Sequence, residues 1–403
     1  MTIAPSATSQ RISQTEFVAL VAMLVASVAF SIDAMLPAMP QIAAELTPAD
    51  PNLAQLIITS FVFGLGLGTF FAGPLSDSFG RKPVILLGAA LYIFASALAW
   101  FAPSLELLLA ARALQGLGAS ATRVVPMAIV RDLYAGRAMA QITSFIMMVF
   151  TLVPAVAPLI GSGIIALTGW RGIFAAFVVF SLISAAWLFL RVIETWPRGQ
   201  RMPFEMGALM RAAKTVMSNR TVQLSTAAQA LCMTVLFASL SSIHQIFDVT
   251  YGRAAGFPWW FALIAVVAGA FSLLNAVLVM RLGMKRLLVI AMGLMIVVTV
   301  GMLALNWVVF AGGLPFAFYI FWQGAVFVHT SMTLGNLSAL AMEPMGAVAG
   351  MAASVITGLA TVGAVLFTVP IGLAFDDTAQ PLMIGALIAV LGALLLAVRI
   401  GEA

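Results

Sequence analysis

One acidic residue, Asp33, stands inside a long apolar run between Phe17 and Met39. A carboxylate within a lipid-spanning helix is unfavourable unless it is paired, hydrated or protonated. Such residues serve as proton relays, ion sites or substrate contacts. Pro37 and Pro40 follow closely and are expected to end the helix. The carboxylate should therefore lie about one to two turns from one membrane face.

Two arginines, Arg112 and Arg123, stand about three turns apart in another apolar run. Arg112 should share the depth of Asp33, which leaves two interpretations. A conformational change that alternately pairs Asp33 with Arg112 and leaves it in a dry site would move a proton, because dry surroundings disfavour the charged carboxylate. A static buried ion pair would only fix helix packing. No acidic partner for Arg123 is obvious in any apolar run, so it either faces a wet central cavity and attracts an anionic or electron-rich substrate, or snorkels to the inner face.

Proton coupling needs a group at depth that changes its charge. Arginine keeps its proton at physiological pH, and Glu106 and Asp248 stand near the ends of apolar runs. Asp33 is therefore the predicted proton carrier, with Arg112 as its partner. His329 is the other titratable candidate at depth, and it is either a second protonation site or a neutral histidine hydrogen-bonded between helices.

The second half of the chain offers uncharged polar side chains instead. Gln229 and Met233 recur at helical spacing, and Gln323 precedes His329 in a later apolar run. Methionine-rich surfaces adapt to varied apolar ligands. The predicted substrate cavity comprises Gln115, Arg123, Gln229, Met233, Gln323 and His329.

The composition identifies the elements that must position these residues. Of 403 residues, 63% are hydrophobic and 8% are charged, whereas soluble domains carry about 25% charged residues. The chain is therefore predicted to be an all-α polytopic membrane protein, embedded in a lipid bilayer. Runs of about 20 apolar residues predict twelve transmembrane helices, at 17–37, 53–73, 84–102, 106–130, 140–166, 173–193, 222–247, 259–280, 287–305, 314–340, 348–373 and 381–399.

The basic residues predict the orientation of these spans. Arg171 and Arg253 are the basic residues of the loops on one side, whereas nearly all others fall in loops on the side of the termini. Loops rich in Lys and Arg remain on the cytoplasmic side of a membrane, so the N- and C-termini should be cytoplasmic. The net charge of +5 is explained by these loops, and we expect no nucleic-acid partner. The one cysteine, Cys232, excludes a disulfide framework.

A polar stretch in the middle of the chain predicts two pseudo-symmetric six-helix halves. The boundaries are 1–193 for the N-terminal half, 194–221 for a cytoplasmic linker and 222–403 for the C-terminal half. Residues 204–217 of the linker suit a short amphipathic surface helix. Ser78–Ile85 also resembles Arg281–Leu288, as expected of a parallel repeat of two six-span units.

Other function classes lack their signatures. No span carries clustered His, Asp or Glu at metal spacing, and no nucleophile–base pair stands out, so we predict no enzyme activity, no metal and no cofactor. No phosphate-binding loop for an ATP-driven pump occurs. A channel is disfavoured because no ring of charge is visible. A transporter of small molecules remains.

Three motifs carry a resemblance to a known family. The loop Gly73–Pro83 resembles the signature loop of the major facilitator superfamily, and Arg112–Ala119 resembles the Arg-x-x-Gln-Gly-x-Gly motif of its proton-coupled members. Pro154–Gly163 resembles the antiporter motif of its drug exporters. Ser31–Pro40 and Gly169–Arg171, together with the end of the fourth span, are similar to the Bcr/CflA-type multidrug exporters.

The resemblance implies the superfamily fold and a conformational gate at Gly73, Asp77, Gly80, Arg81, Lys82, Pro154, Pro158 and Gly161. The alternative for the signature loop is that its basic residues only anchor the topology. The implied function is proton-coupled export of small, mostly apolar drugs from a bacterium, across its inner membrane, by a monomer. The alternative is a specific exporter or importer of one metabolite, such as an amino acid or a siderophore, on the same fold.

Overall fold

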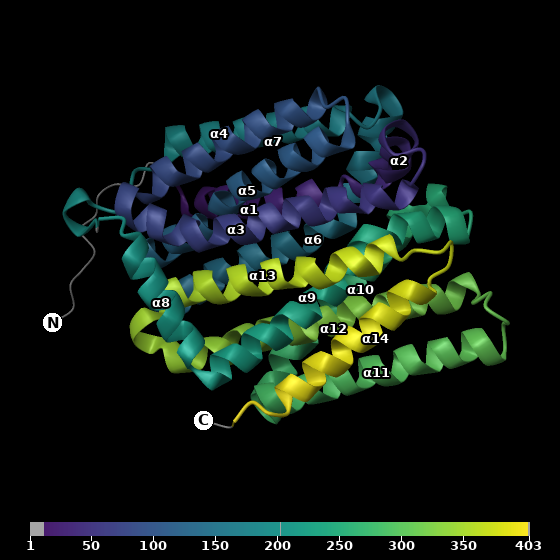
Figure 1. Ribbon diagram of the computed structural model, residues 1–403. Coiled ribbons are helices and arrows are strands. Elements are labelled where there is room, and N and C mark those ends of the chain that lie inside the picture. Colours follow the sequence, from purple (N-terminus) through teal and green to yellow (C-terminus); the bar gives the residue numbers. More distant parts are fainter. Residues whose placement is uncertain (1–11, 202, 402–403) are drawn as a thin grey trace.

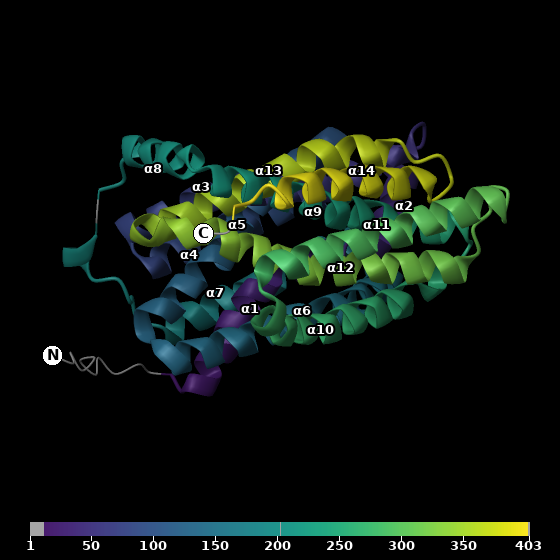
Figure 2. The ribbon, with the colours of Figure 1, turned by 90° about the horizontal axis from the view of Figure 1, so that it is seen from below.

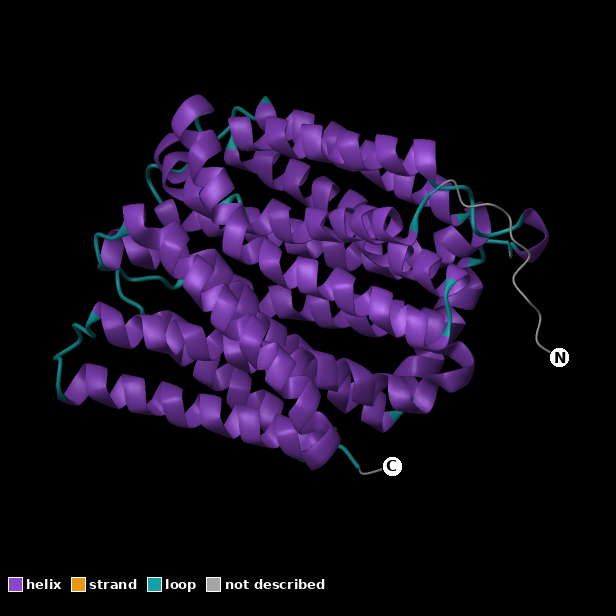
Figure 3. Cartoon of the chain, turned by 180° about the vertical axis from the view of Figure 1, so that it is seen from behind, coloured by secondary structure: helices purple, strands orange, loops and turns teal. Residues whose placement is uncertain are grey.

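The computed structural model describes residues 12–201 and 203–401, and every regular element in these ranges is helical (Figures 1 and 3). Twelve helical stretches are long and apolar enough to cross a membrane, which confirms the predicted number. The predictions for residues 1–11, 202 and 402–403, at the two termini and in the linker, lie outside the described residues.

The first six spans are formed by helices on the N-terminal side of the linker. Their bounds are α1 Gln14–Asp33, η1 Leu36–Ala38, α2 Met39–Leu46, η2 Pro51–Gln55, α3 Leu56–Phe79, α4 Arg81–Trp100, α5 Leu105–Leu133, α6 Gly136–Thr168 and α7 Gly172–Arg191. The linker contains η3 Arg198–Gln200 and α8 Met206–Ser218.

The remaining six spans follow the linker. Their bounds are α9 Arg220–Gln245, η4 Ile246–Thr250, η5 Ala254–Gly256, α10 Phe257–Leu282, α11 Met284–Val308, α12 Phe316–Met342, η6 Glu343–Val348, α13 Ala349–Leu373 and α14 Gln380–Ala397. We call the end of the bundle beside α8 the terminal end, and the opposite end beside α2 the distal end (Figure 1).

The first span differs from the predicted 17–37. Its helix α1 ends at Asp33, and the short helices η1 and α2 extend the span to Leu46. Pro37 and Pro40 occupy the first turns of η1 and α2. Proline suits this position because its fixed φ fits the helix and its missing N–H would be unpaired there anyway. The prolines therefore redirect the chain instead of only stopping it.

Small residues let helices of the N-terminal half interlock. A Cβ on Gly64 of α3 would overlap the carbonyl of Ala113 on α5, and one on Gly116 of α5 would overlap the carbonyl of Phe61 on α3. In membranes, where lipid is as apolar as the side chains, close backbone approach at small residues drives helix association. α3 and α5 are accordingly in contact along much of their length.

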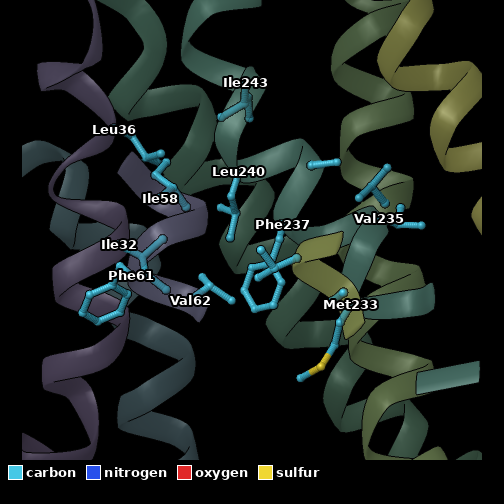
Figure 4. Close-up of a cluster of buried hydrophobic side chains, with 14 of the residues drawn as sticks. Ile32, Leu36, Ile58, Phe61, Val62, Met233, Val235, Phe237, Leu240 and Ile243 are labelled. Carbon is cyan, nitrogen blue, oxygen red and sulfur yellow. The ribbon is translucent and has the colours of Figure 1, made fainter. Parts of the chain in front are cut away.

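The helices before the linker and those after it, which we call the two halves of the chain, meet along two helix pairs, α3 with α13 and α6 with α10. Figures 1 and 2 show α13 beside α3 and α6 beside α10. Toward the distal end α9 also contacts α2, α3 and η1. Buried apolar side chains fill this contact (Figure 4), and we call them the distal cluster: Ile32, Leu36, Ile58, Phe61, Val62, Phe237, Leu240 and Ile243.

The linker helix α8 covers nearly the predicted amphipathic segment. Its apolar side chains Leu209 and Val216 are buried in one cluster with Val355 and Ile356 of α13. α8 therefore packs on the protein at the terminal end. α7 ends at Arg191 and α9 begins at Arg220, while the division into two pseudo-symmetric halves stays a prediction.

Candidate functional site

Asp33 is the last residue of α1, and its side chain is 4% exposed. Within the described ranges its carboxylate forms no ion pair and no hydrogen bond. The next residue, Ala34, is packed against Gly161 of α6, where a Cβ would overlap the Ala34 carbonyl. The carboxylate thus lies at a tight contact between α1 and α6 without a charged partner.

Arg112 of α5 is fully buried. Its Nη2 donates to the carbonyl oxygen of Ser31 at 3.0 Å, and its Nε donates to that of Ile57 at 3.4 Å. Its Nη1 donates to Oε1 of Gln115. The guanidinium also lies 4.4 Å from the ring centroid of Phe61. A cation held by neutral acceptors and an aromatic face is satisfied without a carboxylate.

The acceptors of Arg112 belong to a wider polar network. Ser31 Oγ lies 2.6 Å from the hydroxyl of Tyr92 on α4 and shares a hydrogen bond with it. Ser27 Oγ, one turn earlier in α1, lies 3.1 Å from Thr122 Oγ1 on α5. The network therefore ties α1, α4 and α5 together two residues before Asp33.

Gln115 is fully buried, and its Nε2 donates to Ser96 Oγ on α4 at 2.7 Å. Both ends of its amide are thus used, one by Ser96 and one by Arg112. The geometry gives Gln115 a role in positioning Arg112. Its predicted contact with substrate stays a prediction.

Of the two interpretations of Asp33 and Arg112, the static ion pair does not occur among the described residues. The ion pairs found there all involve other residues, such as Arg81, Arg171 and Arg191. Arg123 is partly exposed on α5, and its contact with substrate stays a prediction.

Several buried polar atoms of the C-terminal half have no partner in the part of the chain that the structure describes. They include Oε1 of Gln229, both amide atoms of Gln323 and both ring nitrogens of His329. All three side chains are at most 4% exposed and stand on α9 and α12, which pack together. An unpaired buried polar group costs about 1–3 kcal/mol, so water or ligand is needed to satisfy them. For His329, the second protonation site and the neutral histidine hydrogen-bonded between helices both stay predictions.

Met233 stands one turn after Gln229 on α9, and both side chains are buried. Figure 4 shows Met233 on the same helix as Phe237. Its sulfur accepts a weak hydrogen bond from Thr361 Oγ1 of α13 at 3.9 Å. Among the described residues, no three His, Cys, Asp or Glu side chains gather in a way that could hold a metal ion.

The signature loop at the terminal end forms a charge network. Arg81 Nη1 donates to Asp77 at 2.5 Å and to Ser76 at 2.7 Å, and its Nε donates to Asp132 of α5 at 2.9 Å. The guanidinium also lies 4.6 Å from the ring centroid of Trp196. The predicted gate residues Asp77 and Arg81 are therefore brought together, and Arg81 holds the ends of α3 and α5.

Glu194 caps the start of α4. Its carboxylate accepts from the backbone N–H of Arg81 at 2.9 Å and of Lys82 at 3.1 Å, where the positive end of the helix dipole favours an anion. Lys82 Nζ donates to the carbonyl oxygens of Phe189 and Val192. Gly80 has φ 102°, which favours glycine. Sequence reasoning did not assign Glu194 or Asp132 to the gate.

The other predicted gate residues lie on α3 and α6. A Cβ on Gly73 would crowd Ser354 Oγ of α13, so Gly73 lies at the contact between the halves. Pro154 and Pro158 stand inside α6, which continues past both of them. Gly161 follows one turn later, against Ala34.

Comparisons with known proteins extend these observations. A profile of the Major Facilitator Superfamily matches residues 20–368. The bicyclomycin resistance protein homolog of Haemophilus influenzae is 29% identical over 358 residues, which cover 88% of each chain. The multidrug resistance protein MdtL of Shewanella oneidensis is 28% identical over 82% of each chain. The chloramphenicol resistance protein of Pseudomonas aeruginosa is 39% identical over 169 residues, or 41% of this chain and 38% of its own.

Among solved structures, a D-xylose–proton symporter is similar with a TM-score of 0.76 at 16% sequence identity. The match covers 95% of this chain and 97% of the other. At this identity the likeness concerns the fold alone.

Proposed function

The chain belongs to the major facilitator superfamily, and on that premise we propose that it exports small, mostly apolar toxic compounds in exchange for protons. It is a multi-pass bacterial membrane protein of a family that carries small molecules across membranes. The proposal adds the direction, the proton coupling and the substrate class. The protein would act as a monomer in the inner membrane. Both of its termini would be cytoplasmic, and it would catalyse no reaction.

The observation that carries the proposal is the buried carboxylate of Asp33, which has no charged partner among the described residues. A buried carboxylate is tolerated in its neutral form, and it releases its proton once water or a cation reaches it. Alternating access would expose Asp33 to each side in turn. One proton would then cross the membrane for each return of the carrier.

Arg112 supports a link between this step and the closure of the distal end. Its guanidinium contacts the ring of Phe61, which belongs to the distal cluster, and it bonds the carbonyl of Ile57 on the same helix. Separation of the halves at the distal cluster would let water reach Arg112 and Asp33, while α3 and α5 stay packed on each other. A hydrated carboxylate close to a guanidinium releases its proton more readily.

The substrate class rests on the relatives named as bicyclomycin, chloramphenicol and multidrug resistance proteins. The unpartnered amides and imidazole of Gln229, Gln323 and His329 support a binding region that offers donors and acceptors. Met233 and the apolar residues around it would supply adaptable contacts. Arg123 would add a positive charge for electron-rich groups. The signature loop would act as the conformational gate.

Drug susceptibility tests this function. Cells that express the chain should tolerate higher concentrations of compounds such as bicyclomycin or chloramphenicol, and a protonophore should remove the difference. Asp33→Asn should behave like the empty vector at equal expression. Glu106→Gln is the matched control, because Glu106 lies in the first turn of α5 and is exposed. Resistance that persists in Asp33→Asn, or in the presence of the protonophore, would contradict proton-coupled export.

A further inference from the structure

A cavity lies at the distal end, between the two halves. Its volume is about 400 Å³, and its walls include Met39 and Gln55 from the N-terminal half. Ser241, Gln245 and Asp248 from the C-terminal half complete it. Both halves thus contribute polar and apolar groups to one cavity, away from the Arg112 network.

A network of side-chain amides forms the polar wall and joins the halves. Gln55 Nε2 donates to Gln245 Oε1 at 2.7 Å, and Gln245 Nε2 donates to Asn52 Oδ1 at 2.7 Å. Ser242 Oγ donates to Gln55 Oε1 at 2.9 Å, and Asn52 Nδ2 donates to the Phe375 carbonyl at 2.8 Å. These bonds join the two halves, so they form this wall only while the halves are in contact at the distal end.

Two groups of the cavity have no partner among the described residues. Ser241 is 3% exposed and its hydroxyl is unpaired. Asp248 is half-buried, and no ion pair of the described chain includes its carboxylate. Other acids nearby are engaged, since Glu45 binds Arg171 at 2.6 Å and Asp50 accepts from a backbone N–H at 3.2 Å. A free carboxylate therefore faces a cavity that is otherwise neutral.

The backbone at Asp248 is unusual. The last turn before the loop, Ile246–Thr250, is a π-helix that directly continues α9. Such turns are rare and are frequent at functional sites, because the extra residue turns side chains out of the helical register. Here the wider turn carries Asp248 and Val249, which both line the cavity.

We propose that this cavity binds small organic cations with an apolar body, and that the bound cation holds the distal end closed. Asp248 would pair with the positive charge, and Ser241 would hydrogen-bond a polar substituent. Met39 and the neighbouring alanines and prolines would pack against the apolar body. The volume falls in the range of small-molecule sites, about 300–1,000 Å³. The site is separate from the proposed substrate cavity.

The effect on transport rests on the proposed function and on the predicted orientation, which puts the distal end outside. A ligand that contacts both halves binds the closed form and not the open one. At a free concentration of about 100 times its Kd, it would lower the ratio of open to closed molecules about 100-fold. A cation added from outside should therefore inhibit export.

Binding is tested first, because it does not depend on transport. The purified full chain in nanodiscs is titrated with benzyltrimethylammonium and with neopentylbenzene, its neutral carbon analogue. We expect saturable binding of the cation, at least tenfold weaker binding of the neutral analogue, and at least tenfold weaker cation binding by Asp248→Asn. Asp377→Asn, an acid of the same end that is outside the cavity lining, should bind like the wild type.

Two further variants test independently whether the cation binds in this cavity. Ala44→Trp adds bulk to an exposed wall position without a change of charge, so it should block the cation even if Asp248→Asn folds poorly. Asp33→Asn should leave binding unchanged. Equal binding by Asp248→Asn and wild type would overturn the site, and so would binding that Asp33→Asn removes and Asp248→Asn keeps.

Transport is tested second, in right-side-out and everted membrane vesicles. The permanently charged cation should slow transport at least tenfold when it bathes the distal face, and Asp248→Asn should be resistant. If the cation binds at Asp248 but leaves transport unchanged in active vesicles, the closing role is overturned while the site stands. If the vesicles transport nothing, the proposed function fails independently of the binding result.

Discussion

Replacement of Asp33 by asparagine should separate transport from its driving force. Asn matches the size of Asp but carries no titratable proton. Because the Asp33 carboxylate has no hydrogen bond or ion pair among the described residues, the substitution breaks no contact of the described structure. We expect the free energy of unfolding to change by no more than about 1 kcal/mol.

The size of the effect on transport follows from one carboxylate per carrier. One proton moving down a pH difference of about 1 unit releases about 1.4 kcal/mol, which sustains about a tenfold substrate gradient. Everted vesicles with an acidic lumen and the membrane potential clamped at zero should therefore accumulate substrate about tenfold. Asp33→Asn should reach equal concentrations inside and outside, while it still exchanges labelled for unlabelled substrate.

His329→Asn is the control, since His329 is the alternative proton carrier named from the sequence and its side chain is buried. It should keep pH-driven accumulation. Substrate-induced proton release from the purified protein gives an independent measurement, and it should vanish in Asp33→Asn alone. If Asp33→Asn still releases protons or accumulates substrate, and His329→Asn does not, the carrier is His329 and the reasoning fails.

Three more substitutions test the surrounding structure. Arg112→Lys cannot reproduce the three guanidinium hydrogen bonds. Because each charge-assisted bond lost costs about 1.5–3 kcal/mol, the unfolding midpoint in detergent should drop and transport should fall at least tenfold. An unchanged midpoint and transport rate would contradict the role of the network. Asp77→Asn removes the charge of a carboxylate that is 37% exposed, and Arg81 keeps its hydrogen bonds to Asp132 and Ser76. Expression should therefore match the wild type while export slows, and equal export rates would refute a gating role. Gly161→Val should lower the unfolding midpoint because its side chain meets the Ala34 backbone, whereas Gly163→Val has open space and should not; equal midpoints would show that α6 moves freely from α1.

The fold could be predicted from the sequence because membrane insertion depends on local composition. Runs of about 20 apolar residues report span lengths directly, and twelve such helices occur in the structure. The first span was predicted less well, because Pro37 was expected to stop a helix. Its place in the first turn of η1 depends on where α1 ends, which packing against α6 helps to determine.

The site could be predicted only in its residue types. Asp33 and Arg112 stand out in the sequence because they are charged residues inside apolar runs, but their partners depend on the tertiary arrangement. Sequence reasoning paired the two with each other, whereas Arg112 is satisfied by neutral groups of α1, α3 and α5. The partnership of Glu194 with the start of α4 joins residues far apart in the chain, and no local pattern reports it.

The interlocked glycines of the N-terminal half have a mechanical consequence. Where the backbone of α3 touches that of α5 at Gly64 and Gly116, there is no flexible side-chain layer that could absorb a relative tilt of the two helices. α3 and α5 must then rotate together as one stiff body, since bistable packed interfaces, not continuous bending, accommodate such movements. The strain of each cycle is thereby concentrated at the α3–α13 and α6–α10 seams. Spin labels across a seam should report large distance changes, while labels on α3 and α5 should keep a constant separation.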